Sequence, residues 1–277
     1  MHILITDSGV GGLSVVAYAE RFVRTRGFTE PARLTFANAA PANDYGYNSM
    51  PSHDVKIETF DRFLRNVTEL YSPDMIYVAC NTLSVFLPEV HPTVPIKGII
   101  ETAIDLLMKE LRSRSVVMIF GTQTTIDSGV YPRLLQERGI AAARIVTQAC
   151  PGLADVISED REGTKAEAEI RKWVDTALAK MPQRDAPIVA CLACTHYGYR
   201  REKFESALGD AIVINPNESA VDDLFASTGN VHDVEVDFVT RYAIPQTTID
   251  TLTWLLRDIS PRTVDALKNF VHVPDLF

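Results

Sequence analysis

The chain has 277 residues, a formal net charge of −9 and 46% hydrophobic residues. This length favours two domains, each large enough to bury a hydrophobic core. The negative charge argues against nucleic acid or an anionic membrane as a partner, because both attract positive surfaces, and favours small molecules.

The first residues and the cysteines indicate the cellular compartment of the protein. Residues 1–6 are a short apolar stretch without a cationic leader, which predicts a first strand rather than a signal peptide and therefore a cytoplasmic location. No apolar run approaches the roughly 20 residues needed to cross a bilayer. Four cysteines in such a chain are expected to be thiols, not a disulfide framework.

Short runs rich in Val and Ile alternate with longer stretches of helical periodicity, a pattern typical of βα units in a parallel sheet. The predicted class is therefore α/β, with mainly parallel sheets flanked by helices. We expect strands at residues 2–6, 33–37, 75–79, 96–99, 115–120, 143–147, 188–191 and 211–214. The clearest helices are expected at residues 54–71, 101–111 and 164–181.

A faint internal repeat relates the two halves of the chain. ILITDSG and VMIFGTQ are each an apolar strand followed by a small polar turn, while IYVACNT and CLACTHY are each a strand that ends in cysteine. Asp7 and Gly121 are 114 residues apart, and so are Cys80 and Cys194. We therefore expect two similarly wound halves.

Polar side chains follow several of the predicted strands. Ligands of parallel α/β sheets bind beyond the carboxyl ends of the strands, so these residues are the candidates for a site. They are Asp7 and Ser8, then Cys80, Asn81 and Thr82, then Thr122 and Thr125, and finally Cys194, Thr195 and His196. If the halves face each other, the two cysteines lie on opposite walls of one cleft.

Two cysteines placed in this way are suited to inverting a carbon centre. That reaction needs a base on one face of the carbon and a proton donor on the other. The start of a helix is expected to lower the pKa of each thiol, which would make a thiolate base.

Other roles for the cysteines remain open. Cys150 and Cys191 are expected to fill the core, as most free cysteines do. Cys191, Cys194 and His196 form half of a zinc motif, but the chain has no second close pair of ligands.

Five segments carry a resemblance to a known family. They are DSGVGGLSV at Asp7, ACNTLS at Ala79, GTQTTIDSGVY at Gly121, ACP at Ala149 and LACTHY at Leu192. Together they resemble the glutamate racemases of the aspartate/glutamate racemase superfamily, with matching order and spacing from Met1 to about Asn217. The tail beyond about Ser227 carries no recognised motif.

The resemblance implies two α/β domains, residues 1–97 plus 210–277 and residues 98–209, with the active site between them. It implies racemisation of an acidic amino acid, L-glutamate to D-glutamate first, for peptidoglycan precursor supply, with no pyridoxal phosphate, no other cofactor and no metal. By matching position, Cys80 and Cys194 would be the acid/base pair, assisted by Asp7 and His196. Substrate contacts would be Ser8, Tyr45, Gly46, Asn81, Thr82, Thr125 and Thr195. A homodimer is suggested by the family alone.

Three positions depart from the family pattern. Asp44 stands where proline usually precedes Tyr-Gly, Ser158 stands where glutamate usually follows the third cysteine motif, and Gly198 replaces a proline. These departures keep other activities open, namely an aspartate racemase, a hydantoin racemase, a maleate isomerase or an aryl-malonate decarboxylase. A non-catalytic ligand- or metal-binding protein is the alternative from another class.

Overall fold

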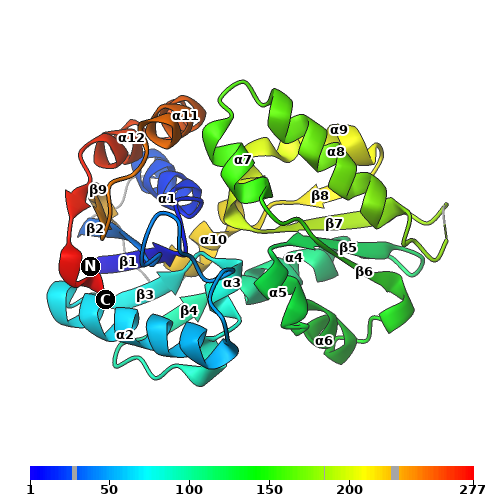
Figure 1. Ribbon diagram of the computed structural model, residues 1–277, viewed down its shortest axis with the longest axis horizontal. Coiled ribbons are helices and arrows are strands. Elements are labelled where there is room, and N and C mark those ends of the chain that lie inside the picture. The colour runs from blue at the N-terminus through cyan, green and yellow to red at the C-terminus, as the bar shows by residue number, and fades with distance from the viewer. Residues whose placement is uncertain (27–29, 184, 226–230) are drawn as a thin grey trace.

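The computed structural model describes residues 1–26, 30–183, 185–225 and 231–277. Within these ranges the chain forms two parallel sheets flanked by helices, one of six strands and one of four (Figure 1). The larger sheet has the order β10(Val271–His272), β9(Val231–Thr240), β2(Glu30–Asn38), β1(His2–Asp7), β3(Met75–Val78) and β4(Ile96–Gly98). The smaller has the order β6(Ile145–Ala149), β5(Val116–Gly121), β7(Ile188–Ala193) and β8(Ile212–Ile214). The α/β class and all eight strands predicted from the sequence are confirmed.

The two sheets repeat one strand order. In the larger sheet β1 lies between β2 and β3, and β4 lies beyond β3. In the smaller sheet β5 lies between β6 and β7, and β8 lies beyond β7. The repeat expected from the sequence is therefore present in the strand order, and it places Cys80 and Cys194 after equivalent strands.

Helices connect and cover the strands. The three clearest predictions are confirmed as α2(His53–Tyr71), α4(Ile99–Glu110) and α8(Thr164–Leu178). Helix α2 is capped by Ser52, whose side chain accepts a hydrogen bond from the backbone N–H of Val55, a common N-cap arrangement. The other α-helices are α1(Leu13–Arg26), α3(Asn81–Ser84), α5(Gln123–Asp127), α6(Val130–Glu137), α7(Leu153–Glu159), α9(Arg201–Leu208), α10(Pro216–Phe225), α11(Gln246–Leu256) and α12(Pro261–Lys268). Short 3₁₀ helices are η1(Leu87–Glu89), η2(Ala142–Arg144), η3(Thr195–Arg200) and η4(Pro274–Leu276).

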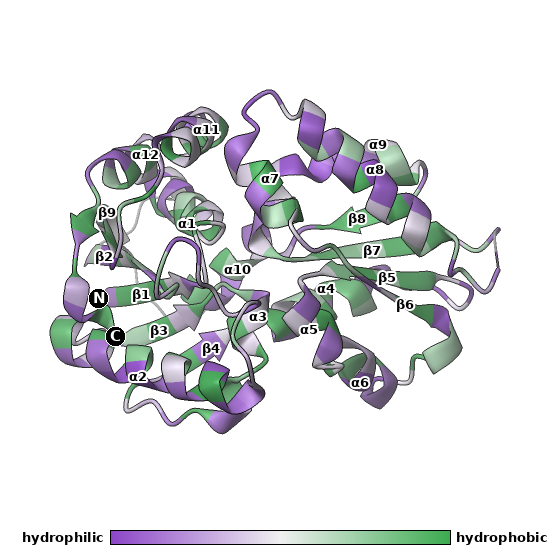
Figure 2. Ribbon diagram, viewed as in Figure 1, coloured by the Kyte–Doolittle hydropathy of each residue, from purple (hydrophilic) through white to green (hydrophobic). Residues whose placement is uncertain are grey.

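The hydrophobic core lies on both faces of each sheet. Ile3 and Ile5 pack in one buried cluster with residues of α1, while Leu4 packs in another with residues of α2. This explains why the first strand is a continuous apolar run, because side chains alternate between two buried faces. Figure 2 shows the same distribution, with hydrophobic residues along the strands and mixed faces on outer helices such as α8.

The carboxyl-terminal segment, in which no motif was recognised, completes the larger sheet. Strand β9 pairs with β2, and β10 pairs with β9, while α11 and α12 pack beside them. Strand β8 pairs with β7, so residues 212–214 belong to the smaller sheet although they follow the boundary expected at residue 210. The division into two domains stays a prediction.

No helix among the residues that the structure describes is long and apolar enough to span a bilayer.

Candidate active site

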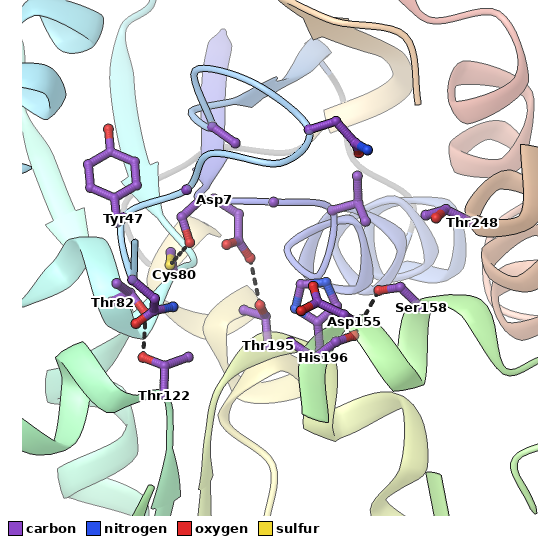
Figure 3. A pocket seen from close by; sticks show the side chains of 18 of the residues that line it. Asp7, Tyr47, Cys80, Thr82, Thr122, Asp155, Ser158, Thr195, His196 and Thr248 are labelled. Atoms are coloured by element: carbon purple, nitrogen blue, oxygen red, sulfur yellow. Dashed lines mark hydrogen bonds between the residues drawn. The ribbon is translucent and has the colours of Figure 1, made fainter. Parts of the chain in front are cut away.

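A cavity of about 370 Å³ lies where the carboxyl ends of strands from both sheets meet (Figure 3). Strand β1 ends at Asp7, β3 is followed by Cys80, and β7 is followed by Cys194. All three side chains line the cavity, together with Ser8, Gly46, Asn81, Thr82, Thr195 and His196 from the predicted site. The structure thus brings the two cysteines into one cavity.

Cys80 lies at the start of the short helix α3 and is 4% exposed. Its Sγ lies 3.0 Å from the Oγ of Ser8. Burial, and then the charge of Asp7, raises the pKa of the Cys80 thiol well above its usual value, although hydrogen bonds from Ser8 and Leu83 act in the opposite direction. The lowered pKa expected at a helix start is therefore wrong here, because a one-turn helix offers little against complete burial.

Cys194 precedes η3 and is 6% exposed. Its Sγ lies 3.9 Å from Nδ1 of His196. Burial, followed by the charge of Asp7, raises the pKa of the Cys194 thiol, while the backbone N–H groups of His196 and Tyr197 lower it in part. The expectation of a lowered pKa is wrong for this cysteine also, and both thiols are protonated at neutral pH.

Asp7 connects the two halves at the centre of the site. Its Oδ2 accepts a hydrogen bond of 2.6 Å from Oγ1 of Thr195, which follows the central strand β7 of the other sheet. The carboxylate acts on the pKa of both Cys80 and Cys194, so it lies within electrostatic reach of both. Asn217 fixes the backbone of Thr195, since its Nδ2 donates a hydrogen bond to the Thr195 carbonyl oxygen.

His196 is the basic side chain of this site. Burial lowers the pKa of its imidazole below the usual 6.5, while the charges of Asp7 and Asp155 act to raise it. The ring is therefore neutral at pH 7, and a neutral imidazole can accept a proton from a nearby thiol.

A chain of threonine hydroxyls closes one side of the cavity. Oγ1 of Thr82 lies 2.8 Å from Oγ1 of Thr122, which lies 3.0 Å from Oγ1 of Thr125. Thr82 and Thr122 line the cavity, whereas Thr125 is buried behind them. Tyr45 also lies off the lining, with 41% of its surface exposed, and its neighbour Tyr47 lines the cavity instead. The roles predicted for Tyr45 and Thr125 stay predictions.

Several lining residues escaped the sequence analysis. Tyr242, Ile244, Pro245 and Thr248 come from the segment after β9. The rule that sites gather after strand ends would have found them, had the alternating pattern of β9 been recognised as a strand. Asp155 and Glu159 lie one turn apart on α7 and both line the cavity.

The charges on the cavity wall are mainly negative. Asp7, Asp44, Asp155 and Glu159 line it, and the lining has no lysine or arginine among the described residues. Ser158 also lines the cavity, but its hydroxyl donates to the Ala154 carbonyl oxygen of its own helix. Asp155 of the same helix acts electrostatically on His196 and raises the pKa of its imidazole in part.

The half-zinc motif is not assembled. Cys191 packs in the cluster with residues of α4 and α6, while Cys194 packs in the opposite cluster of the smaller sheet. In the described part of the chain no group of three or more His, Cys, Asp or Glu side chains is placed to hold a metal ion.

Comparisons with known proteins agree on one family. The model of the Asp/Glu/Hydantoin racemase family matches residues 49–224. The glutamate racemase of Aquifex pyrophilus is 30% identical over 223 residues, which cover 79% of this chain and 80% of that protein. Its solved structure has a TM-score of 0.69 at 25% identity and covers 93% of this chain and 95% of that one. The glutamate racemase structure from Campylobacter jejuni has a TM-score of 0.72 at 22% identity, covers 92% of this chain and 98% of that one, and shows a shared fold.

Proposed function

We propose, on the premise that this chain belongs to the Asp/Glu/Hydantoin racemase family, that it interconverts L- and D-glutamate with Cys80 and Cys194 as the acid/base pair. Membership of that family makes the chain a racemase. Glutamate is taken from the relatives' activity. The observation that carries the two-cysteine mechanism is that both thiols line one cavity, with the Asp7 carboxylate within electrostatic reach of each.

The reaction is a balanced exchange of one proton. One cysteine, as thiolate, takes the proton from Cα, and the electron pair of the broken Cα–H bond moves into the substrate carboxylate. The other cysteine, as thiol, gives its proton to the opposite face of Cα, where the same electron pair forms the new bond. The two sulfurs end with exchanged protonation states, and the reverse reaction restores them.

The resting thiols must lose a proton before either acts as the base. For Cys194 the neutral imidazole of His196, 3.9 Å away, is the acceptor. For Cys80 the nearby carboxylate of Asp7 is the candidate acceptor. The substrate ammonium group favours this step, because a positive charge beside a buried sulfur stabilises the thiolate.

Neutral donors on the wall are suited to the substrate carboxylates. We assign this role to Ser8, Gly46, Asn81, Thr82 and Thr195, the last through its backbone N–H because its hydroxyl donates to Asp7. We keep Tyr45 and Thr125 as proposed contacts from outside the lining. Stabilising negative charge that develops on a carboxylate is a large contribution to such catalysis. We also propose a cytoplasmic homodimer that needs no cofactor and supplies D-glutamate for peptidoglycan.

One observation favours a second substrate class. Asp44 is exposed on the cavity wall, and no lysine or arginine among the described lining residues balances it. An acid with a single carboxylate, or a neutral ring as in hydantoins, meets less repulsion there than a dicarboxylate does.

Incubation of the purified protein with L-glutamate in D₂O, without added cofactor, tests the proposal. We expect D-glutamate to form with deuterium at Cα, followed by ¹H NMR and a chiral assay. A parallel reaction with L-aspartate and a substituted hydantoin separates the substrate classes. If the protein neither inverts any of these compounds nor exchanges their Cα proton for deuterium, the proposed function is overturned.

A further inference from the structure

Asn81 has a hydrogen-bond partner in the structure for only one half of its side-chain amide. It directly follows Cys80, is 1% exposed and lines the cavity. Its Oδ1 accepts a hydrogen bond of 2.5 Å from the hydroxyl of Tyr131. An amide group has an acceptor oxygen and an NH₂ donor, so the donor is the part that remains. No described residue accepts a hydrogen bond from Nδ2, although the atom is buried.

Tyr131 reaches Asn81 from the other half of the molecule. It lies on α6 and is 1% exposed, whereas Asn81 begins α3, which follows strand β3 of the larger sheet. Burial raises the pKa of the Tyr131 phenol well above its usual value, so the phenol keeps its proton. Because the Asn81 oxygen can only accept, the phenol proton is directed to it.

Cys191 lies against the same phenol from the core side. Burial raises the pKa of its thiol to about 12, so the thiol is protonated at neutral pH. A phenol that donates its one proton to Asn81 can still accept from this thiol. With the Tyr131 proton given to Oδ1 of Asn81, the part of the Asn81 amide that remains free to donate is Nδ2.

We infer that Tyr131 is a positioning residue of the proposed reaction, which fixes the Asn81 amide so that Nδ2 donates to a substrate carboxylate beside Cys80. The inference rests on the proposed function for the identity of the substrate. With the amide reversed, its oxygen would face the cavity that Asp7 already lines and would repel a carboxylate. The hydroxyl of Tyr131 excludes that arrangement as long as it donates to Oδ1.

Tyr131→Phe removes the hydroxyl and little else. We expect KM for glutamate to rise about tenfold, with a smaller fall in kcat, because a contact to the carboxylate exists in both the ground state and the transition state. Tyr77→Phe is the matched control, since Tyr77, like Tyr131, is fully buried and lies off the cavity lining, whereas the hydrogen bond to Asn81 comes from Tyr131. It should keep both constants within about twofold of the wild type.

A double-mutant cycle separates positioning from a general structural role. Since Tyr131 acts through Asn81, Tyr131→Phe should cost nothing further in the Asn81→Ala background. In the double variant neither partner of the hydrogen bond remains, so no buried acceptor lacks its donor. The double variant should therefore melt no lower than Tyr131→Phe, and it can still be assayed if that single variant is unstable.

The outcomes are distinct. An active wild type whose Tyr131→Phe variant keeps its KM, or whose two substitutions add independently, would overturn the positioning role. A wild type that inverts none of the tested acids would instead overturn the proposed function, and the substrate contact of Asn81 with it.

Discussion

The two halves of the molecule share a strand order but surround their cysteines differently. Cys80 lies 3.0 Å from the hydroxyl of Ser8, while Cys194 lies 3.9 Å from the imidazole of His196. A hydroxyl stabilises a charged sulfur but is too weak a base to accept its proton, whereas a neutral imidazole is able to accept one. The repeated strand order therefore places two cysteine thiols in equivalent positions, but the groups that could accept their protons differ.

Removal of either sulfur is the largest disturbance of this comparison. We expect Cys80→Ala and Cys194→Ala each to lower kcat about 1,000-fold or more, which is about 4 kcal/mol, because each variant loses the proton donor or acceptor of one face. Cys150→Ala is the control, since Cys150 is buried outside the cavity lining. Racemisation followed by circular dichroism measures the effect, and full activity in either first variant would contradict the mechanism.

Replacement of His196 by Asn affects one side alone. We expect kcat to fall about 100-fold. Because the equilibrium constant of racemisation is 1, kcat/KM must fall equally in both directions, so the asymmetry appears in kcat and KM taken separately. Burial holds the pKa of His196 below 6.5, so wild-type activity should persist at pH 7 and decline as pH falls through that lowered pKa. The variant should lack this acid limb, and an unchanged pH profile would argue against His196 as the acceptor.

Gly11→Ala tests the contact between the halves. A Cβ at Gly11 would lie 2.3 Å from Oγ1 of Thr195 and 2.5 Å from Nδ1 of His196. We expect a loss of about 1–3 kcal/mol in stability and a roughly tenfold fall in kcat/KM, because the bond from Thr195 to Asp7 must shift. At Gly9 the added Cβ would stay 3.4 Å from His196, an ordinary contact. Gly9→Ala should therefore melt closer to the wild type, and equal melting temperatures for all three proteins would refute the close approach.

Asp44→Asn should have the smallest effect. Asp44 is exposed on the cavity wall, so its repulsion of a dicarboxylate is screened by water and salt. We expect KM for glutamate to fall about twofold at low ionic strength and by less at high salt. A salt titration of KM in both proteins checks this, and a KM that rises would show that Asp44 aids binding.

The sequence predicted the inner strands β1, β3, β5 and β7 well because each is an apolar run that is buried almost throughout. It failed at β9, where polar residues alternate with apolar ones in VHDVEVDFVT and no family motif was present to help. The strand-end rule found Asp7, Cys80 and Cys194. It could not find Asp155, because the approach of α7 to His196 depends on packing between elements.

The sequence also misjudged the thiols, and for a physical reason. A helix start after Cys80 predicted a lowered pKa, but the direction depends on desolvation, which only the packed structure reveals. The orientation of the Asn81 amide is equally a tertiary property, since Tyr131 lies 50 residues further along the chain.

The hydrogen bond from Thr195 holds the Asp7 carboxylate between the two halves, and this one carboxylate raises the pKa of both Cys80 and Cys194. Neutralising Asp7 would make Cys80 and Cys194 stronger acids at the same moment. The two thiols therefore respond together to any change at this carboxylate, and an inflection of an activity–pH curve that reports one of them also reports the other.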